Sequence, residues 1–415
     1  MKKYCLTAAV FVLCSLAAIV GFNLYMDPFN IFQLFPGELN ANKASLNKYA
    51  RFGKMATLYI QKPEAVILGS SRSEFGLSAY QLEELTGYSA YNASLSGANF
   101  YEVYRAFQQA AQNDLKLAVI GIDLFMFNVF RKDSLEEGQM FSVSEDGKLN
   151  KDYLHHLLST SLLSWNATSA SVRSLRKSKR TPSYRLDGRR NEESRAERII
   201  HQKGYEETFR EVEKMFFKSE WFSCGSGDEG FSFGNATDNR MILLTKIIDL
   251  ANKKDIKLIF IISPTHARLF EAMSVAGLWD DFELWKRQLV KTLPKKPSGQ
   301  NVELWDFSGY SAYSTELIPE DSDPPAPMQW YLETSHYTSA LGNIVLSKVF
   351  SDDTTNPFGK KITTDNIEHH LSELRYQQLD WRQKNPAWHE DLKNIYTLAR
   401  QEPGSRAPCP DLKPH

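Results

Sequence analysis

Short apolar runs, separated by stretches of mixed polarity, dominate the hydrophobic pattern of the chain. Four runs have the length of a buried strand: 65–68, 117–120, 258–262 and 302–305. A weaker strand is expected at 90–93. Stretches with helical patterning lie between these runs, at 78–87, 101–112, 240–253 and 266–293. Because the strands are apolar throughout and alternate with helices, the pattern predicts an α/β fold whose parallel sheet is covered on both faces.

The first apolar run, from Cys5 to Met26, is longer than any strand requires. At about 1.5 Å per residue, a helix of roughly 22 residues spans the hydrocarbon core of a bilayer. Lys2 and Lys3 precede the run and Asp27 follows it, which favours a cytoplasmic N-terminus. We therefore expect a single-pass inner-membrane protein whose C-terminal part lies on the periplasmic side. A cleaved signal peptide is the alternative interpretation.

Changes in this patterning divide the chain into segments. The expected segments are a cytoplasmic tip and anchor at 1–26, a membrane-proximal connector at 27–62, an α/β domain at 63–124 and 238–351, an insertion at 125–237, and a C-terminal helical extension at 352–415. The insertion follows the third strand at the edge of the sheet where catalytic groups gather, so we expect it to cover or border the active site. Its basic residues between Arg173 and Arg198 suit anionic lipid head groups or an acidic glycan, or form a solvated loop.

Composition and charge exclude several classes of protein. The 49 basic and 50 acidic residues give a net charge of −1, so overall charge offers no case for a nucleic-acid partner. Outside the N-terminal run the only cysteines are Cys224 and Cys409, which form either one disulfide or two free thiols. The chain has no C-x-x-C pair and no H-E-x-x-H motif, and we expect neither a metal nor a cofactor.

Candidate chemistry follows the apolar strands, because catalytic groups gather at the carboxyl ends of parallel strands. After the first strand, Gly69-Ser70-Ser71-Arg72 places a serine in a glycine-supported turn, where its hydroxyl can be exposed. The second strand leads into the tight loop 92–97, in which Gly97 lets a backbone N–H approach a developing oxyanion. Each segment alone is also a common structural turn.

The last strand precedes the sequence Glu333-Thr334-Ser335-His336. A carboxylate three residues before a histidine can hold one imidazole nitrogen while the other acts as a base toward a serine. A surface E-x-x-H is the structural alternative. Strand-end placement nevertheless brings Ser71, Gly97 and His336 to one edge of the sheet.

Together these segments resemble the SGNH hydrolase family of GDSL-type esterases and acyltransferases. Gly69 to Arg72 matches the family's serine turn, 92–97 its glycine loop, and 333–336 its terminal D-x-x-H with Glu for Asp. The resemblance implies a flavodoxin-like sheet, the SGNH hydrolase fold. It also implies Ser71 as nucleophile, His336 as general base, Glu333 as its orienting acid, and the Ser71 and Gly97 amides as oxyanion donors.

One motif of the family is missing. Where the family supplies an asparagine as oxyanion donor, this chain has Gly121-Ile122-Asp123-Leu124. A carboxylate repels an oxyanion, so we expect one of three situations. Asp123 turns away from the oxyanion, another group such as Asn99 substitutes for the missing asparagine, or catalysis is weak or absent. Ser70 also replaces the usual aspartate. Similar Gly-Ser-Ser turns occur in membrane-tethered relatives of alginate-acetylation proteins and of the D-alanyl transfer protein of teichoic acid synthesis, which favours envelope acyl-group chemistry.

Three neighbouring residues are further candidates. Arg72 can hold a substrate carboxylate or phosphate by paired hydrogen bonds, or form a salt bridge with Glu74 or Asp123. Asp306 is either a second acid or a structural residue. His266 either lines the site or begins a helix.

The expected function is that of a membrane-anchored periplasmic serine esterase or O-acyltransferase acting on an acylated envelope glycan or a related small ester. A transferase would need an acyl donor, delivered by a membrane partner protein. The alternative is a catalytically inactive SGNH-like module that binds a glycan or a partner in an envelope assembly or export complex; the missing asparagine supports it, and the set of Ser71, Glu333 and His336 opposes it.

Overall fold

A six-stranded, mostly parallel sheet forms the centre of the protein in the computed structural model, which describes residues 2–129, 131, 140–219, 233, 240–294, 302–319, 326–351 and 356–402. The strands are β1 (Ala65–Leu68), β2 (Ala90–Asn92), β3 (Leu117–Ile122), β4 (Lys257–Ile262), β5 (Val302–Asp306) and β6 (Lys360–Lys361). They lie in the order β2-β1-β3-β4-β5-β6, and only β6 runs antiparallel to its neighbour. The predicted α/β class and the five parallel strands are confirmed, whereas the short strand β6 was not predicted.

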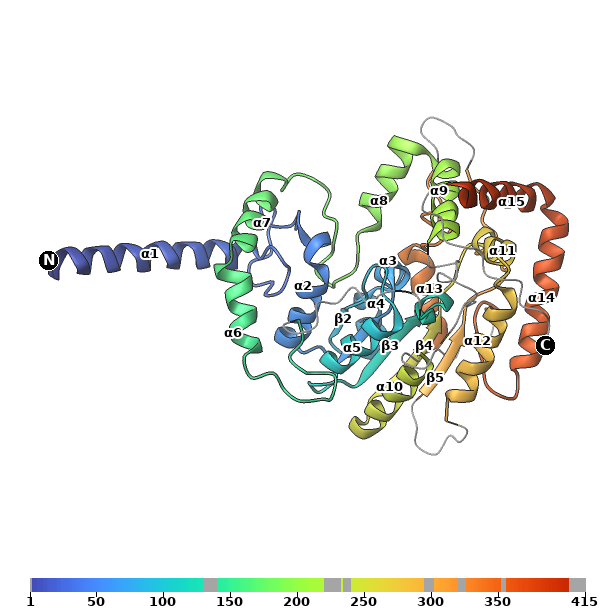
Figure 1. Ribbon diagram of the computed structural model, residues 1–415, viewed down its shortest axis with the longest axis horizontal. Coiled ribbons are helices and arrows are strands. Elements are labelled where there is room, and N and C mark those ends of the chain that lie inside the picture. Colours follow the sequence, from blue (N-terminus) through green and yellow to red (C-terminus); the bar gives the residue numbers. More distant parts are fainter. Residues whose placement is uncertain are drawn as a thin grey trace.

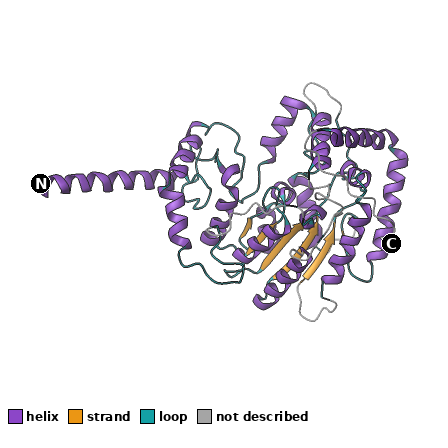
Figure 2. Ribbon diagram, viewed as in Figure 1, coloured by secondary structure: helices purple, strands orange, loops and turns teal. Residues whose placement is uncertain are grey.

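Helices cover both faces of the sheet (Figures 1 and 2). Around the sheet lie α3 (Ser71–Gly76), α4 (Ala79–Thr86), α5 (Phe100–Ala110), α10 (Arg240–Lys254), α11 (Ala267–Val275), α12 (Trp279–Thr292) and α13 (Ser339–Phe350). Alternate residues of each strand pack into two different cores: Val66 and Leu68 belong to the core under α5 and α10, and Ala65 and Ile67 to the core under α4 and α13. Burial on both faces explains why the central strands β1 and β3 carry no polar side chain.

The strand order decides where a ligand site can form. The chain passes from β1 outward to β2, then crosses back past β1 to β3 and continues through β4 to β5 in the other direction. In a parallel sheet of this order, the connections that leave the carboxyl ends of β1 and β3 separate to opposite faces and leave a crevice between them. The segments after Leu68 and Ile122 therefore lie where this topology predicts a ligand site.

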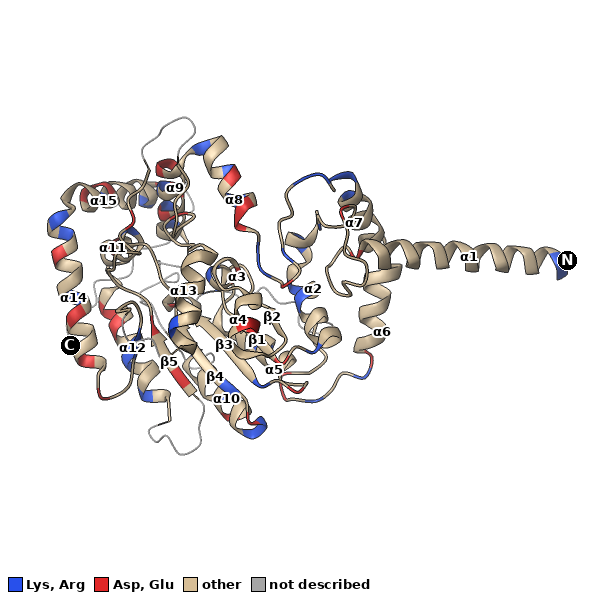
Figure 3. Ribbon diagram, turned by 180° about the vertical axis from the view of Figure 1, so that it is seen from behind, with Lys and Arg blue, Asp and Glu red and all other residues tan. Residues whose placement is uncertain are grey.

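The N-terminal helix α1 (Lys2–Met26) extends away from the domain (Figure 1). Its mean hydropathy reaches 2.5, and among the described residues it is the one helix long and apolar enough to cross a bilayer. Figure 3 shows basic residues only at its far end. These properties are shared by membrane anchors and signal sequences.

The domain end of α1 is integrated into the fold. The buried Asn23 donates from Nδ2 to the carbonyl of Leu162 (2.9 Å) and accepts from the hydroxyl of Ser171 (2.8 Å). Lys43 donates from Nζ to the carbonyl of Met26 (2.9 Å), where a cation also stabilises the helix dipole. The last turn of α1 is therefore held by hydrogen bonds to distant segments of the chain.

The expected connector contains an unpredicted helix, α2 (Leu46–Gln61), which packs against α5. Gly53 permits this packing, because a Cβ there would lie 2.4 Å from the carbonyl oxygen of Phe29. The connector is thus a folded layer and not an extended link.

The expected insertion spans two different parts of the structure (Figure 1). Its described helical elements begin just before residue 125, and the label η marks a 3₁₀ or π-helix. They are η1 (Leu124–Phe127), α6 (Tyr153–Leu158), η3 (Ser159–Leu163), α7 (Trp165–Arg176), α8 (Glu192–Arg198), η4 (Ile199–Lys203) and α9 (Tyr205–Lys218). η3 and α7 pack on α1, whereas α9 packs on α15 (Pro386–Gln401) of the C-terminal extension.

The C-terminal extension folds back onto the sheet domain. Its helices are α14 (Ile367–Lys384) and α15, which lie within the helical extension expected at 352–415. Arg382 donates to Glu271 (2.6 Å), and Asp391 accepts from Arg268 (2.9 Å). These buried or half-buried charge pairs join the extension to α11.

Candidate active site

The turn after β1 places Ser71 at the carboxyl edge of the sheet. Gly69 has φ +145°, and a Cβ there would lie 2.7 Å from the carbonyl oxygen of Gly121, so only glycine fits. Ser70 is the N-cap of α3 and accepts from the N–H of Arg72. Ser71 is consequently the first residue of the helix α3, which the sequence pattern did not predict.

Ser71, His336 and Glu333 form a hydrogen-bonded chain. The Ser71 hydroxyl lies 2.7 Å from Nε2 of His336, and Nδ1 of His336 contacts a carboxylate oxygen of Glu333. These partners assign the imidazole a proton on Nδ1 and a free lone pair on Nε2. Ser71 is buried, but 7% of its surface remains accessible to solvent. This is the arrangement in which a histidine can accept the serine proton.

A tight turn before α13 presents the histidine. The N–H of Leu332 bonds to the carbonyl of His336 (2.9 Å), and Tyr331 and Tyr337 form an antiparallel bridge. Inside the turn, Glu333 accepts from the N–H groups of Ser335 (3.0 Å) and His336 (3.2 Å). The local sequence thus fixes the carboxylate and the imidazole relative to each other.

The environment of the pair sets its protonation. Burial opposes ionisation of Glu333. The interaction with His336, which is charged at the low pH where Glu333 titrates and is hydrogen-bonded to it, outweighs burial together with the Arg195 charge and the Ser335 N–H, and lowers the pKa of Glu333 to about 2. Burial lowers the pKa of His336 below its usual 6.5; Glu333 opposes this, whereas Arg195 and Arg72 add to it. At neutral pH the site therefore holds a carboxylate and a neutral imidazole, which is the state of a general base.

Asp123 lies at the same edge, after β3, in a buried network. Its carboxylate accepts from Nη1 of Arg72 (2.7 Å) and from the hydroxyl of Ser70 (2.8 Å). Arg72 also donates from Nε to the hydroxyl of Ser335 (3.2 Å). Of the two roles considered for Arg72, the structure contains the salt bridge with Asp123. This network neutralises the carboxylate and ties α3 to the histidine turn.

No match to a known family accompanies this geometry. A comparison with models of protein families finds none that fits the chain, and no curated protein is significantly similar in sequence. The resemblance to SGNH hydrolases stays a prediction that rests on the motifs.

The loop after β2 lies beside the serine turn. The N–H of Leu95 bonds to the carbonyl of Gly69 (3.0 Å), and Asn92 donates to the carbonyls of Ser73 (2.9 Å) and Leu77 (2.8 Å). Gly97 has φ +68°, a conformation that favours glycine. No hydrogen bond among these described residues joins Gly97 to Ser71, so its expected oxyanion role stays a prediction.

Asn99, the expected substitute donor, begins α5. Its side chain accepts from the N–H of Glu102 (3.0 Å), while the Glu102 carboxylate accepts from the N–H of Asn99 (3.0 Å). This reciprocal capping box gives Asn99 a structural role that the sequence analysis did not assign.

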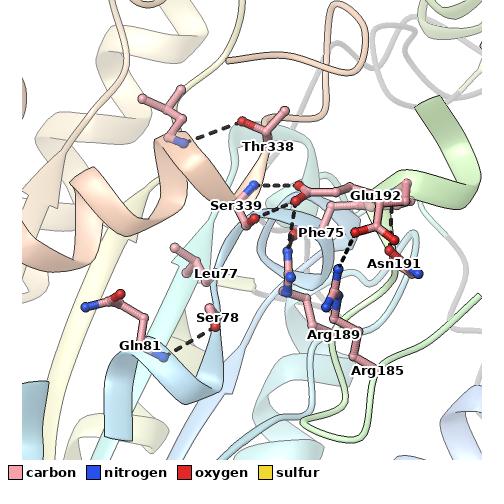
Figure 4. Close-up of polar contacts among 12 residues, drawn as sticks. Phe75, Leu77, Ser78, Gln81, Arg185, Arg189, Asn191, Glu192, Thr338 and Ser339 are labelled. Carbon is pink, nitrogen blue, oxygen red and sulfur yellow. Dashed lines mark hydrogen bonds and ion pairs between the residues drawn. The ribbon is translucent and has the colours of Figure 1, made fainter. Parts of the chain in front are cut away.

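Residues of the expected insertion contact α3, which begins at Ser71, and the start of α13, which follows the histidine turn (Figure 4). Glu192 accepts from the N–H of Ser339 (2.6 Å) at the start of α13, and Arg189 donates to the carbonyl of Phe75 (3.3 Å) in α3. Arg195 lies 3.4 Å from the Glu333 carboxylate. The sequence pattern gave no signal for Arg195, because it comes from a separate helix far along the chain from its partner.

A buried ion pair joins α3 to α2. Lys54 of α2 donates to Glu74 (2.8 Å) and to the carbonyl of Ser94 (2.5 Å). Burial lowers the pKa of Lys54, although Glu74 opposes this shift. The connector therefore contributes a charged group that joins the serine turn to the loop after β2.

The remaining candidates have structural roles. Asp306 pairs with Lys286 (2.6 Å) and His370 (2.7 Å). His266 caps α11 and contacts the carbonyl of Glu316 (2.8 Å). In the part of the chain that the structure describes, no three His, Cys, Asp or Glu side chains are grouped to hold a metal ion. Cys224 and Cys409 both lie outside the described residues.

Proposed function

We propose that this chain is a membrane-anchored serine esterase or O-acyltransferase of the SGNH-like type, with Ser71 as nucleophile. The observation that carries the proposal is the hydrogen-bonded chain from the Ser71 hydroxyl through His336 (2.7 Å) to the ionised Glu333. The position of Ser71 after β1, beside the change of strand direction, supports it, because ligands of parallel α/β sheets bind at that place.

The geometry suits acyl transfer in two steps. In the first, Ser71 Oγ attacks the ester carbonyl while His336 takes the hydroxyl proton on Nε2 and Glu333 stabilises the imidazolium. His336 then gives that proton to the departing alcohol, leaving an acyl-serine. In the second, His336 takes a proton from water or from an acceptor hydroxyl, which attacks the acyl carbon. The bond between the acyl carbon and Ser71 Oγ then breaks, and His336 returns the proton to Ser71 Oγ. The Ser71 and Gly97 amides are the proposed donors to the oxyanion.

The acceptor decides whether the enzyme is an esterase or a transferase. With water the product is a free acid, and with a glycan hydroxyl it is a new ester. We propose an acylated envelope glycan or a related small ester as substrate, on the periplasmic side of the inner membrane. A transferase would take its acyl group from a membrane partner protein.

A binding module is the second candidate, and one observation favours it. The group at the position of the family's asparagine is Asp123, and its carboxylate is engaged by Arg72 (2.7 Å) and Ser70 (2.8 Å). It therefore supplies no side-chain donor to an oxyanion. An SGNH-like domain of this kind can retain its crevice for glycan binding without turnover.

Covalent labelling separates the two candidates. Full-length protein in detergent is treated with a fluorophosphonate and the modified peptide is identified by mass spectrometry. We expect the label on Ser71 and its loss in Ser71→Ala. The matched control is Ser70→Ala, which removes a hydroxyl from the same turn, but one that bonds to Asp123 and not to His336. An unlabelled Ser71 in folded protein would leave the binding module as the better account.

A further inference from the structure

Five exposed apolar side chains surround the domain end of α1, and we refer to them as the collar. They are Leu34, Phe35 and Leu39 of the connector, and Leu163 and Trp165 at the junction of η3 and α7. Trp165 is 82% exposed, although it is among the largest apolar side chains. A soluble protein seldom leaves such a group uncovered beside several others.

Hydrogen bonds place both parts of the collar next to the last turns of α1. On one side, Asn23 donates to the carbonyl of Leu162 (2.9 Å), the residue before Leu163. On the other side, Asn40 donates to the carbonyls of Tyr25 (2.6 Å) and Phe35 (2.8 Å). The rings of Tyr25 and Phe35 stack with centroids 6.1 Å apart. The collar therefore lies at the level of residues 23–25 of α1.

The length of α1 puts a membrane boundary at the same level. A hydrocarbon core of about 30 Å takes about 20 helical residues at a rise of roughly 1.5 Å. Counted from Tyr4, the first residue after the two lysines, this length ends at Asn23. Figure 1 shows α6 and α7 at the base of α1, where a membrane perpendicular to the helix would meet the domain.

We propose that the collar rests in the outer interface of the lipid bilayer that α1 spans, so that the domain is seated on the membrane. This inference rests on the anchor in the proposed function. Trp and Phe favour the interface, where an apolar ring meets both acyl chains and water. The five collar residues carry no charge, and their continuity with an apolar helix identifies lipid as the partner that covers them.

The test uses fluorescence in full-length protein reconstituted into lipid nanodiscs. The four native cysteines are replaced by serine, and the environment-sensitive dye nitrobenzoxadiazole is attached at Leu34→Cys or Leu163→Cys. The matched control is Leu379→Cys in α14, because Leu34 and Leu379 are both 59% exposed. Figure 1 shows α14 at the opposite end of the domain from α1.

We expect lipids with a nitroxide near the head group to quench both collar labels about twofold or more, and to leave the label at 379 unchanged. Equal quenching at all three positions, or access of aqueous iodide to the collar labels without lipid quenching, would overturn the proposal. Failure of the anchor is recognised separately: the protein would then be extracted by alkaline washing, or its intact mass would lack the N-terminal helix.

Discussion

Two buried carboxylates at the edge of the sheet, Glu333 and Asp123, differ in the partner that each one holds. Glu333 faces His336, a group that is neutral at rest and gains a proton during acyl transfer. Asp123 faces Arg72, whose charge is permanent. The first carboxylate can therefore stabilise a charge that develops in the reaction, and the second stabilises only the folded site. The comparison shows that burial and position alone do not make a carboxylate catalytic.

The largest expected effect is on the Glu333 side of this comparison. Ser71→Ala or His336→Ala should lower hydrolysis of a small acetyl ester by roughly 10⁴-fold to 10⁶-fold, because nucleophile and base act as one unit. For the same reason, the double variant should be no slower than either single one. Steady-state rates of the full-length variants, with thermal unfolding as the folding control, check this. Full activity in Ser71→Ala would refute the catalytic assignment.

The second prediction concerns the orienting acid. Glu333→Gln should lower the rate by about 10²-fold to 10⁴-fold, because the amide neither stabilises the imidazolium nor selects its tautomer. Asp306 does not replace it, since that carboxylate is held by Lys286 (2.6 Å) and His370 (2.7 Å). Asp306→Asn is the matched control for activity. A Glu333→Gln rate within a factor of about two of wild type would show that the Nδ1 contact is not used.

The third prediction concerns stability on the Asp123 side. Asp123→Asn should destabilise the protein by about 3–5 kcal/mol, because it leaves the Arg72 charge buried without its counter-ion. The double variant Asp123→Asn with Arg72→Met should recover part of this loss. Chemical denaturation of the detergent-solubilised protein measures both. If Asp123→Asn instead raised ester hydrolysis at unchanged stability, Asp123 would be limiting catalysis and the comparison drawn above would fail.

The smallest expected effect is a shift of the pH profile. A lowered His336 pKa means that kcat/KM falls only when the pH drops through a value below 6.5, where the imidazole becomes protonated. Arg195 is one cause of that lowering, so Arg195→Met should raise the His336 pKa and move the acid limb to higher pH. Arg198→Met, on the same helix, is the matched control and should shift it less. An unchanged acid limb in Arg195→Met would mean that the two charges do not interact.

Local patterns made much of the fold predictable. The central strands β1 and β3 are apolar throughout, and α4 lies within the helical stretch predicted at 78–87. Helix α3 was missed because it is short and most of its buried residues are polar, so that no apolar stripe marks it as a helix. Helix α2 was missed because Gly53 and the buried Lys54 interrupt the pattern of an amphipathic surface helix.

The candidate site was predictable where its partners are close in sequence or lie at the carboxyl ends of parallel strands. Strand-end placement predicted that Ser71 and His336 share one edge of the sheet, and the two are hydrogen-bonded (2.7 Å). Glu333 and His336 are three residues apart, so their spacing alone indicated the contact. Arg195 and Lys54 approach the site from separate helices, and nothing in their local sequence indicates a tertiary partner. The salt bridge between Asp123 and Arg72 was predicted only as one of two alternative roles for Arg72.

The hydrogen bonds at Asn23 have a consequence for how a substrate is met. A catalytic domain on a flexible tether sweeps a volume above the bilayer, and its local concentration depends on tether length. In this chain the proposed anchor continues into the domain, and the Asn23 bonds to Leu162 (2.9 Å) and Ser171 (2.8 Å) leave no such tether. Ser71 would then stay at one height and search by lateral diffusion in two dimensions. Acyl groups presented at that height would be met often, and those on polymers farther out would have to bend toward the membrane.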